Sequence, residues 1–407
     1  MVTALLALAL ASTPDGGVVI EGRLRSGTPS QGTCTMERLA ATTPAVRWAW
    51  RSACGLDWVQ QHALSSGALA LGNYDFNPVL LFDEARALSV GVKDVPPFAA
   101  EAVQRVRQRL VRSLPPGVFE VTVDPRDQSL LVMMDQQLLR GRRDAAAWEP
   151  VFPSTKPWSA DARALAWDRS PAVKNPWLVT DATQGKEHLV RLIGPADTSR
   201  VLVRRPRTTS ELTRTRLAAV LLPGAALPIV SVLLNDGRHS LFVPTPDGAD
   251  LVERTFDRVP LVGPPPPPAG ASTKPSGLPR QCSETVLEHV GEARAEPLLF
   301  ERGGAAFLAY GVQTTRSRLR FGLVPRRGPT PDDDTYACEW IEDARAVRPA
   351  LVIAEVLPDG STRERLHLDL QQPVVQLVID QGPSHLVAML KSLDLTVLSL
   401  DPSVLAR

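Results

Sequence analysis

A pattern of apolar runs separated by polar turns recurs along this chain. Its clearest form is an apolar residue, an acidic or amide residue, a short polar loop and a second apolar run, as in VDPRDQSLLV at residues 123–132. The pattern returns near residues 234, 300 and 379. The apolar runs are short and either alternate with polar residues or are wholly apolar, which predicts β-strands joined by tight turns.

The acidic or amide position of the turn is the most constant part of the pattern. Short polar side chains suit this position because they hydrogen-bond to free turn amides. The residues at this position are Asp124, Asn235, Glu301 and Asp380, and looser copies place Asp57, Asp168 and Asp343 there. The shorter steps between these seven units, about 40 residues, match the length of a four-stranded propeller blade. The pattern therefore predicts a mainly β chain, a β-propeller with seven blades.

Three insertions interrupt the regular spacing, at residues 95–117, 206–227 and 263–280. The first predicts an amphipathic helix over residues 99–114, because apolar residues recur on one helical face and prolines flank the segment. The second reads either as a helix or as an extra strand. The third contains five successive prolines, which favour an extended surface segment.

Two hairpin features support the propeller reading. Residues 351–370 predict two strands around a turn at Pro358, Asp359 and Gly360, because glycine readily adopts the left-handed conformation that such a turn needs. Ring closure in a propeller usually borrows a strand from the other end of the chain. The segment VVIEGRLR at residues 18–25 is the expected partner of DLTVLSLD near residue 400.

This organisation resembles the degenerate seven-bladed β-propeller repeat proteins. The Gly-His and Trp-Asp signature and the kelch double glycine are absent, so the resemblance implies a fold and no functional residues. Residues 97–135 also resemble the helix–strand–strand of periplasmic secretin N-domains, which implies a separate α/β subdomain at that place.

Composition and charge narrow the possible functions. Hydrophobic residues make up 44% of the 407 residues, enough for a large core, and we expect one propeller domain over residues 18–407. The 45 Lys and Arg residues nearly balance the 44 Asp and Glu residues, giving a formal net charge of +1. This balance argues against a general nucleic-acid-binding protein, which usually carries a basic excess.

The N-terminal residues predict export. An apolar run over residues 4–11 ends in Ala-Leu-Ala, which is typical of a signal peptide with its cleavage site. We expect cleavage after residues 1–12 and a periplasmic or extracellular protein. The alternatives are a mis-assigned start or a strand of the fold. The run is too short to span a membrane, and no later window is long enough, so no transmembrane segment is predicted.

Cysteine usage is compatible with export. The four residues allow three disulfide pairings, and the local pairs are Cys34 with Cys54 and Cys282 with Cys338. The alternative is four reduced, buried thiols. The absence of a Cys-x-x-Cys spacing argues against a zinc ribbon and a redox motif.

Candidate chemistry is sparse. The sequence contains no metal-binding histidine spacing, no nucleophile elbow and no phosphate-binding loop. We therefore predict no catalytic residue, no cofactor and no metal site. The adjacent Asp332, Asp333 and Asp334 lack the ligand spacing of a calcium loop. A dense arginine group containing Arg204, Arg205 and Arg207 is the candidate contact for an anionic partner, and a solvated strand edge is the alternative.

Three functions remain open. The leading hypothesis is an exported, non-enzymatic binding or scaffold protein that uses one propeller face to bind a protein or glycan. The second is a hydrolase or lyase acting on glycans, with paired carboxylates among Asp57, Asp124, Asp168, Glu301, Asp343 and Asp380 gathered in the central channel. The third is a structural component of an envelope secretion or motility machine, suggested by the secretin-like segment.

Overall fold

All the regular structure that can be described in this chain is β-strand. The computed structural model describes residues 9–12, 18–22, 34–39, 45–52, 59–63, 69–73, 79–82, 87–90, 118–123, 129–134, 138–141, 148–152, 162–167, 173, 175–206, 215–234, 237–256, 267–269, 271, 274–276, 282, 285–326, 335–379, 386–391 and 395–400. Within those ranges no helix occurs, which confirms the mainly β prediction. The helix predicted over residues 99–114 lies outside them and stays a prediction.

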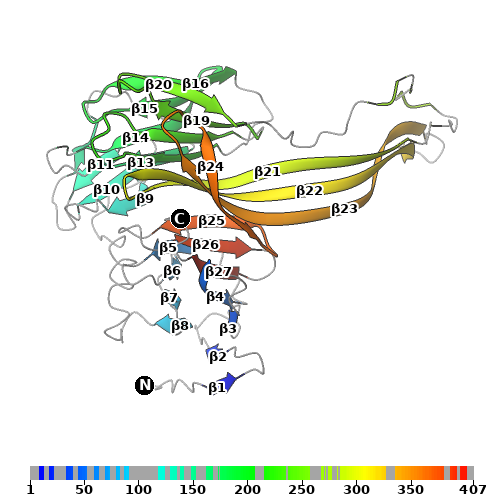
Figure 1. The fold of residues 1–407 in the computed structure, drawn as a ribbon, viewed down its shortest axis with the longest axis horizontal. Coiled ribbons are helices and arrows are strands. Elements are labelled where there is room, and N and C mark those ends of the chain that lie inside the picture. Colours follow the sequence, from blue (N-terminus) through cyan, green and yellow to red (C-terminus); the bar gives the residue numbers. More distant parts are fainter. Residues whose placement is uncertain are drawn as a thin grey trace.

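Antiparallel pairing divides the strands into six sheets (Figure 1). The first sheet contains β5 (Val59–Ala63), β6 (Leu69–Asn73), β7 (Val79–Phe82) and β8 (Ala87–Val90). The second contains β9 (Val118–Val123), β10 (Leu130–Met134), β11 (Leu138–Gly141) and β12 (Glu149–Pro150). The third contains β13 (Ala162–Ala166), β14 (Trp177–Gln184), β15 (Glu187–Ile193) and β16 (Ser199–Pro206).

The fourth and fifth sheets follow the same strand order, and the sixth joins strands from distant parts of the sequence. The fourth contains β17 (Arg216–Val220), β18 (Ile229–Leu233), β19 (His239–Pro244) and β20 (Leu251–Thr255). The fifth contains β21 (Thr285–Arg302), β22 (Ala305–Arg326), β23 (Thr335–Val356) and β24 (Thr362–Asp369). The sixth contains β25 (Val374–Ile379), β26 (Leu386–Lys391) and β27 (Leu395–Leu400), joined by β4 (Val46–Ser52), β3 (Cys34–Leu39), β2 (Val18–Gly22) and β1 (Ala9–Ser12).

The first strands of successive sheets lie next to one another, which makes the chain a β-propeller. β13 contacts β17, β17 contacts β21, β21 contacts β25, and β25 contacts β5 across the join between the ends of the chain. The described residues form six blade-like sheets where the repeat spacing predicted seven, so the predicted blade number is not confirmed. The unit assigned to Asp343 is the reason for the difference, because that residue lies inside the continuous strand β23.

The ring closes through a different N-terminal strand from the one predicted. β4 pairs with β27, with Leu395 opposite Ser52 and Leu398 opposite Ala49. The predicted closing strand, β2, lies two strands further out, between β1 and β3. β4 is better suited to this place because its Trp48 and Trp50 side chains are buried, which a closing strand inside the ring requires.

The repeated turn does not occupy one equivalent position in every blade. Asp124 and Asp380 fall between the first and second strands of their sheets, and Glu301 ends a first strand. Asn235 instead falls between the second and third strands of the fourth sheet. Since neighbouring strands are antiparallel, that turn lies at the opposite end of its blade, and the predicted equivalence of the four positions is wrong for Asn235.

The core lies between neighbouring blades. Val179 and Leu192 pack with Val230 and Phe242 between the third and fourth sheets. Similar clusters join the fourth sheet to the fifth and the fifth to the sixth. Every residue of β18 is buried, because both faces of that strand contact another blade. This burial on both faces explains why the sequence of such a strand is a continuous apolar run.

The structure describes two of the predicted connections. The segment at residues 206–227 contains β17, so its strand reading was correct, and it supplies the first strand of a blade as well as a connection. The predicted hairpin at residues 351–370 is confirmed. Gly360 has a φ angle of 81°, and its amide donates a hydrogen bond to the carbonyl of Leu357 at 2.8 Å.

Candidate functional site

Three strands of the fifth sheet continue far beyond the blade and form a projecting arm (Figure 1). We define the arm as residues 285–294 of β21, 312–326 of β22 and 335–349 of β23. β24 pairs only with the part of β23 from Ala350 to Val356, so it supports the blade and not the arm. At the usual strand rise the arm part of β22 extends about 50 Å.

Alternation along β22 explains how the arm keeps its shape. Ser317, Leu319 and Phe321 are buried, whereas Arg316 and Arg318, which flank Ser317, are exposed. Successive side chains of a strand point to opposite faces, so β22 has one covered face and one solvated face. The arm is therefore an amphipathic sheet and not an extended loop.

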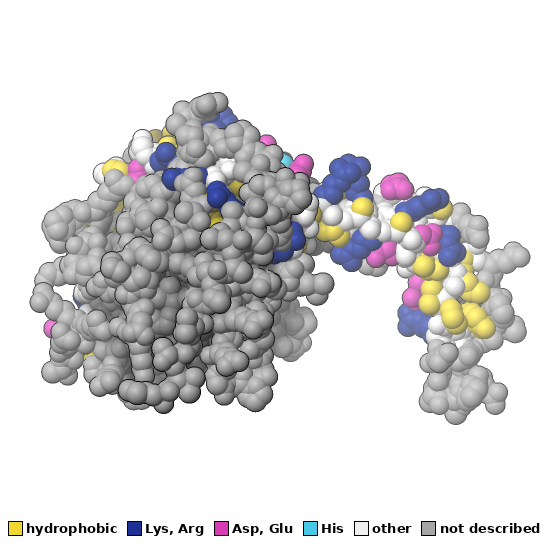
Figure 2. All heavy atoms as spheres, turned by 90° about the horizontal axis from the view of Figure 1, so that it is seen from below, with side chains coloured by type: hydrophobic (Ala, Val, Ile, Leu, Met, Phe, Trp, Pro, Cys, Tyr) yellow, Lys and Arg dark blue, Asp and Glu magenta, His cyan; other side chains and the backbone are white. Residues whose placement is uncertain are grey.

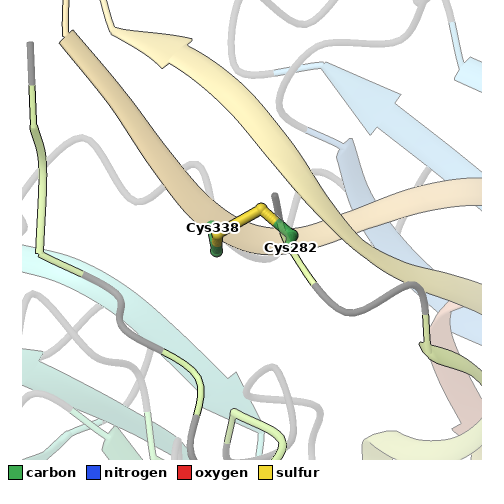
Figure 3. Close-up of a disulfide and its surroundings, with 2 residues drawn as sticks. All are labelled: Cys282 and Cys338. Carbon is green, nitrogen blue, oxygen red and sulfur yellow. A yellow bond between two sulfur atoms is a disulfide. The ribbon is translucent and has the colours of Figure 1, made fainter. Parts of the chain in front are cut away.

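The tip of the arm is fixed by covalent and apolar contacts. Cys282 and Cys338 form a disulfide with a Cα–Cα separation of 5.8 Å (Figure 3). The rings of Phe321 and Trp340 meet edge to face with centroids 5.3 Å apart. This disulfide is one of the two predicted pairs. Cys34 begins β3 and Cys54 lies outside the described residues, so the other pair stays a prediction.

The Pro-rich insertion reaches the same tip. Ser276 and Tyr336 exchange backbone hydrogen bonds of 3.1 and 2.9 Å. Because Cys282 follows a few residues later, the insertion connects the fourth blade to the far end of the arm. The insertion therefore contacts the arm in addition to linking two blades.

An aromatic clamp holds the base of the arm against the propeller. The guanidinium carbon of Arg294 lies 4.8 Å from the centre of the Phe256 ring and 5.0 Å from that of Tyr310. Glu292 accepts a hydrogen bond of 2.9 Å from Nε of Arg294. Cations over aromatic faces are attracted by the ring quadrupole, so Arg294 joins the arm to two neighbouring blades.

A buried histidine completes this clamp. The ring of His239 lies 4.6 Å from that of Phe256, and its Nε2 atom is 2.8 Å from Oγ of Ser231. Burial, followed by the positive charge of Arg294, lowers the pKa of His239 to about 3. The imidazole is therefore neutral at physiological pH. A neutral, enclosed Ser–His pair supports packing here.

One face of the arm carries a row of arginines. Arg316, Arg318 and Arg320 occupy alternate positions of β22, and Arg348 lies on the same face opposite Thr314. Arg320 is 3.3 Å from the carboxylate of Asp343. The other three make no ion pair with any described residue and are exposed. We call these four residues the arginine face.

The arm also exposes aliphatic side chains. Val286 is 50% exposed and Val290 49%, and both lie on the same face as the arginines, opposite Arg320 and Arg316. Leu287 and Val347 are exposed on the other face. Figure 2 shows the Lys and Arg side chains distributed along the arm and hydrophobic side chains gathered towards its tip. Four of the six exposed large hydrophobic residues among those described belong to the arm.

The arginine cluster predicted from the sequence is not a single surface. Arg204 is exposed and donates a hydrogen bond of 2.9 Å to Glu187. Arg205 points to the other face of β16, where it is buried beside Asp181 and donates a hydrogen bond of 3.2 Å to Oγ1 of Thr215. Arg207 lies outside the described residues. Arg205 thus holds blades together and is not available to a partner.

That interior position belongs to a polar cluster between the third and fourth blades. His188 Nδ1 and Arg205 Nη2 each lie 3.9 Å from an oxygen of Asp181. All three side chains are buried, on the second, third and fourth strands of the blade and away from the innermost strand. The cluster combines charges that could serve acid–base chemistry. Because the cluster is buried and lies away from the innermost strand, it is arranged as a structural link between the two blades.

The carboxylates predicted to share a channel do not meet where they can be described. Glu301 caps its own turn, accepting a hydrogen bond of 2.7 Å from the amide of Gly304. Asp343 lies far out on the arm beside Arg320. The other four predicted carboxylates, Asp57, Asp124, Asp168 and Asp380, lie outside the described residues. The two that can be placed have separate structural roles.

The described part of the chain offers no grouping of three or more His, Cys, Asp or Glu side chains suited to a metal ion. Over the same residues we find no helix with the length and hydrophobicity needed to cross a membrane. The segment that resembles a secretin N-domain supplies β9 and β10 of an ordinary four-stranded sheet, which contradicts the separate subdomain that the resemblance implied.

Comparison with known proteins finds no match to a protein family and no similar curated protein. Among solved structures, a gluconolactonase from Xanthomonas campestris is 14% identical with a TM-score of 0.39, over 89% of this chain and 94% of that one. The Dos1 propeller is 9% identical with a TM-score of 0.35, over 98% and 93%. The WD40 domain of SCAP from fission yeast is 8% identical with a TM-score of 0.28, over 91% and 98%. Likenesses this distant carry no argument about activity, and the propeller assignment rests on the strand contacts above.

The arm was missed from the sequence, although one signal in the sequence marks it and its strands are unusually long. The run TRSRLRF at residues 315–321 places arginine at every second position, which is typical of a strand with one charged face. Strands of 18 and 22 residues also greatly exceed the usual five or six residues of a strand. The seven-unit spacing divided this stretch between two blades and so hid its length.

Proposed function

We propose that this chain is a non-enzymatic binding or scaffold protein, in which the propeller is a rigid base and the arm is the element that engages a partner protein. The observation that carries the proposal is the arm itself. A sheet that leaves the propeller core costs conformational entropy without adding to that core. Its exposed arginine and aliphatic side chains give it the composition of a protein-contact surface.

The clamp at the base supports the same role. Arg294, held between Phe256 and Tyr310, fixes the direction in which the arm leaves the ring. Rigid presentation lowers the entropy lost when a partner binds. An exported location remains part of the proposal, supported by the apolar run at residues 4–11, and a glycan is the alternative partner. The hydrolase alternative gains no support, because Glu301 and Asp343 lie apart.

An arm-shortened variant tests this proposal. Residues 257–293 are replaced by a short Gly-Ser linker, which can close because Phe256 and Arg294 are in contact. Residues 314–348 are replaced by Asn-Gly, since Gln313 and Pro349 are directly opposite and this dipeptide forms tight hairpins. Circular dichroism and the melting temperature check that the propeller remains folded.

The measurement is cross-linking and mass spectrometry in an extract of the source organism, with the full chain and the variant compared. We expect proteins cross-linked to the full chain to be lost from the variant. Retention of the same partners by a folded variant would show that the arm is not the binding element. Turnover of lactone or glycan substrates by the full chain would favour the hydrolase alternative instead.

A further inference from the structure

We propose that the arginine face of the arm is a docking site for an acidic segment of a partner protein, one in which carboxylates alternate with aliphatic or small side chains. This inference rests on the proposed function and adds to it the chemistry of the partner and the face of the arm that binds it.

The first argument is charge. Arg316 and Arg318 on β22 and Arg348 on β23 are exposed and have no ion pair with any described residue, whereas Arg320 is already satisfied by Asp343. Like charges gathered on one face repel one another, and an anionic partner relieves that repulsion. Arginine in particular favours carboxylates, because its planar guanidinium can make two parallel hydrogen bonds to one of them.

The second argument is spacing. Arg316 and Arg318 are two residues apart on one strand, so their Cα atoms repeat at about 6.7 Å along the arm. An extended acidic segment repeats its own alternate side chains at the same distance. Carboxylates at alternate positions can therefore meet successive arginines without a change of register.

The third argument is the apolar border of the row. Val286 and Val290 line it on β21, directly opposite Arg320 and Arg316, and both are about half exposed; the exposed Glu288 lies between them, opposite Arg318. Ala344 and Ala346 line it on β23, opposite Arg318 and Arg316. Aliphatic side chains next to unpaired cations suit a protein segment that buries apolar surface while it pairs its charges.

The same border argues against nucleic acid. Single strands are usually held by aromatic side chains that stack on the bases. The aromatic residues of the described arm, Phe321, Tyr336 and Trp340, all lie on the opposite face by their register. The near-neutral charge of the whole chain points the same way.

The test uses the full chain and a fluorescein-labelled peptide built from the repeat Glu-Val-Glu-Ser, with binding followed by fluorescence anisotropy. The variant is Arg316→Gln with Arg318→Gln. The matched control is Arg345→Gln. Arg345 is exposed and lies on β23 of the arm, but on the other face, opposite Ser317. A peptide of the repeat Gln-Val-Gln-Ser controls for charge.

We expect the acidic peptide to bind the full chain, to bind the double variant about tenfold or more weakly, and to bind the Arg345→Gln control unchanged. Affinity should fall as salt concentration rises. Val290→Ser should weaken binding as well, by a smaller factor. The Gln-Val-Gln-Ser peptide should not bind measurably.

Several outcomes would overturn the inference. The inference fails if the acidic peptide does not bind, or if the Arg345→Gln control loses as much affinity for it as the double variant does. It also fails if a single-stranded oligonucleotide or phosphatidylserine vesicles bind more tightly than the peptide. Self-association in sedimentation that the double variant abolishes would contradict it as well. If the arm-shortened variant loses its partners while Arg316→Gln with Arg318→Gln keeps them, this inference fails and the proposed function stands. If the arm-shortened variant keeps its partners, the proposed function itself fails.

Discussion

Arg294 and Phe256 lie face to face where the arm leaves the propeller, with 4.8 Å between the guanidinium carbon and the ring centre. Phe256 follows β20 of the fourth blade, and Arg294 belongs to β21 of the fifth. The contact therefore bridges two blades and fixes the first residues of the arm. The same guanidinium carbon lies 5.0 Å from the ring centre of Tyr310, so two aromatic rings contact Arg294.

Replacing Arg294 with Met should lower the free energy of unfolding by about 0.5–2 kcal/mol, the usual range for a cation–π contact that is partly desolvated. The variant keeps an apolar side chain in the clamp and removes only the charge. The pKa of His239 should rise, because the charge of Arg294 contributes to holding it down. Chemical denaturation and NMR titration measure the two effects. Arg316→Met, a fully solvated site on the same arm, should change stability by no more than about 0.5 kcal/mol.

The neutral His239 should make stability depend on pH. Its pKa is about 3 in the folded protein, below the ordinary value of 6.5, so the unfolded chain binds a proton first as pH falls. Stability from this group is complete above pH 6.5 and decreases as pH drops towards 3. Between pH 7 and pH 5 the loss should be about 2 kcal/mol. Denaturant melts at both pH values measure it.

Two variants isolate that dependence from the titration of carboxylates. His239→Gln should remove about 2 kcal/mol of the difference between the two pH values. His367→Asn, which replaces a half-exposed histidine on β24, serves as the matched surface variant. An identical pH dependence in His239→Gln and the original protein would contradict the buried neutral imidazole.

Gly360→Ala should destabilise the protein more than Gly304→Ala does. Both glycines have positive φ angles, 81° and 84°, so alanine at either position is strained by about 1–2 kcal/mol. A Cβ atom at Gly360 would also lie 2.5 Å from Cγ of Arg254, whereas nothing lies within 4 Å of one at Gly304. We expect an additional loss of about 1–3 kcal/mol for the overpacked position. Equal destabilisation of the two variants would show that the turn does not press on the fourth blade.

Removing the disulfide should loosen the tip of the arm and leave the ring intact. Cys282→Ser with Cys338→Ser should speed hydrogen exchange at the amides of Ser276 and Tyr336, which pair with each other near the bond. Amides of β18 in the ring, far from the tip, should exchange at their original rates. Mass spectrometry after deuterium labelling distinguishes the two regions. Faster exchange throughout the ring would mean that the disulfide supports the whole fold.

Much of the fold could be predicted because it is encoded locally. The alternation of apolar and polar residues and the Pro-Asp-Gly turn at residues 358–360 depend on neighbours in sequence, and the structure has them as expected. The Asn235 turn shows the limit of local reading. The same residues suit the first or the second turn of a blade, since either one joins two antiparallel strands.

The arm and the ring closure depend on contacts that are distant in sequence. The segments at residues 18–22 and 46–52 both read as strands, and only the burial of Trp48 and Trp50 against the rest of the ring favours the second for closure. The arm clamp likewise joins Phe256, Arg294 and Tyr310 from three separate strands or strand ends. No spacing within the sequence relates these residues, so the site could not be assembled from the pattern alone.

The pairing of β4 with β27 has a consequence during synthesis of the protein. β4 leaves the ribosome before β27, and β27 emerges only after the blades between them have been translated. Until then the tryptophans of β4 have no ring to enter, and the exposed edge of the strand is open to wrong partners. A chain that stops in the last blade, before β27, would leave every earlier blade in an open ring.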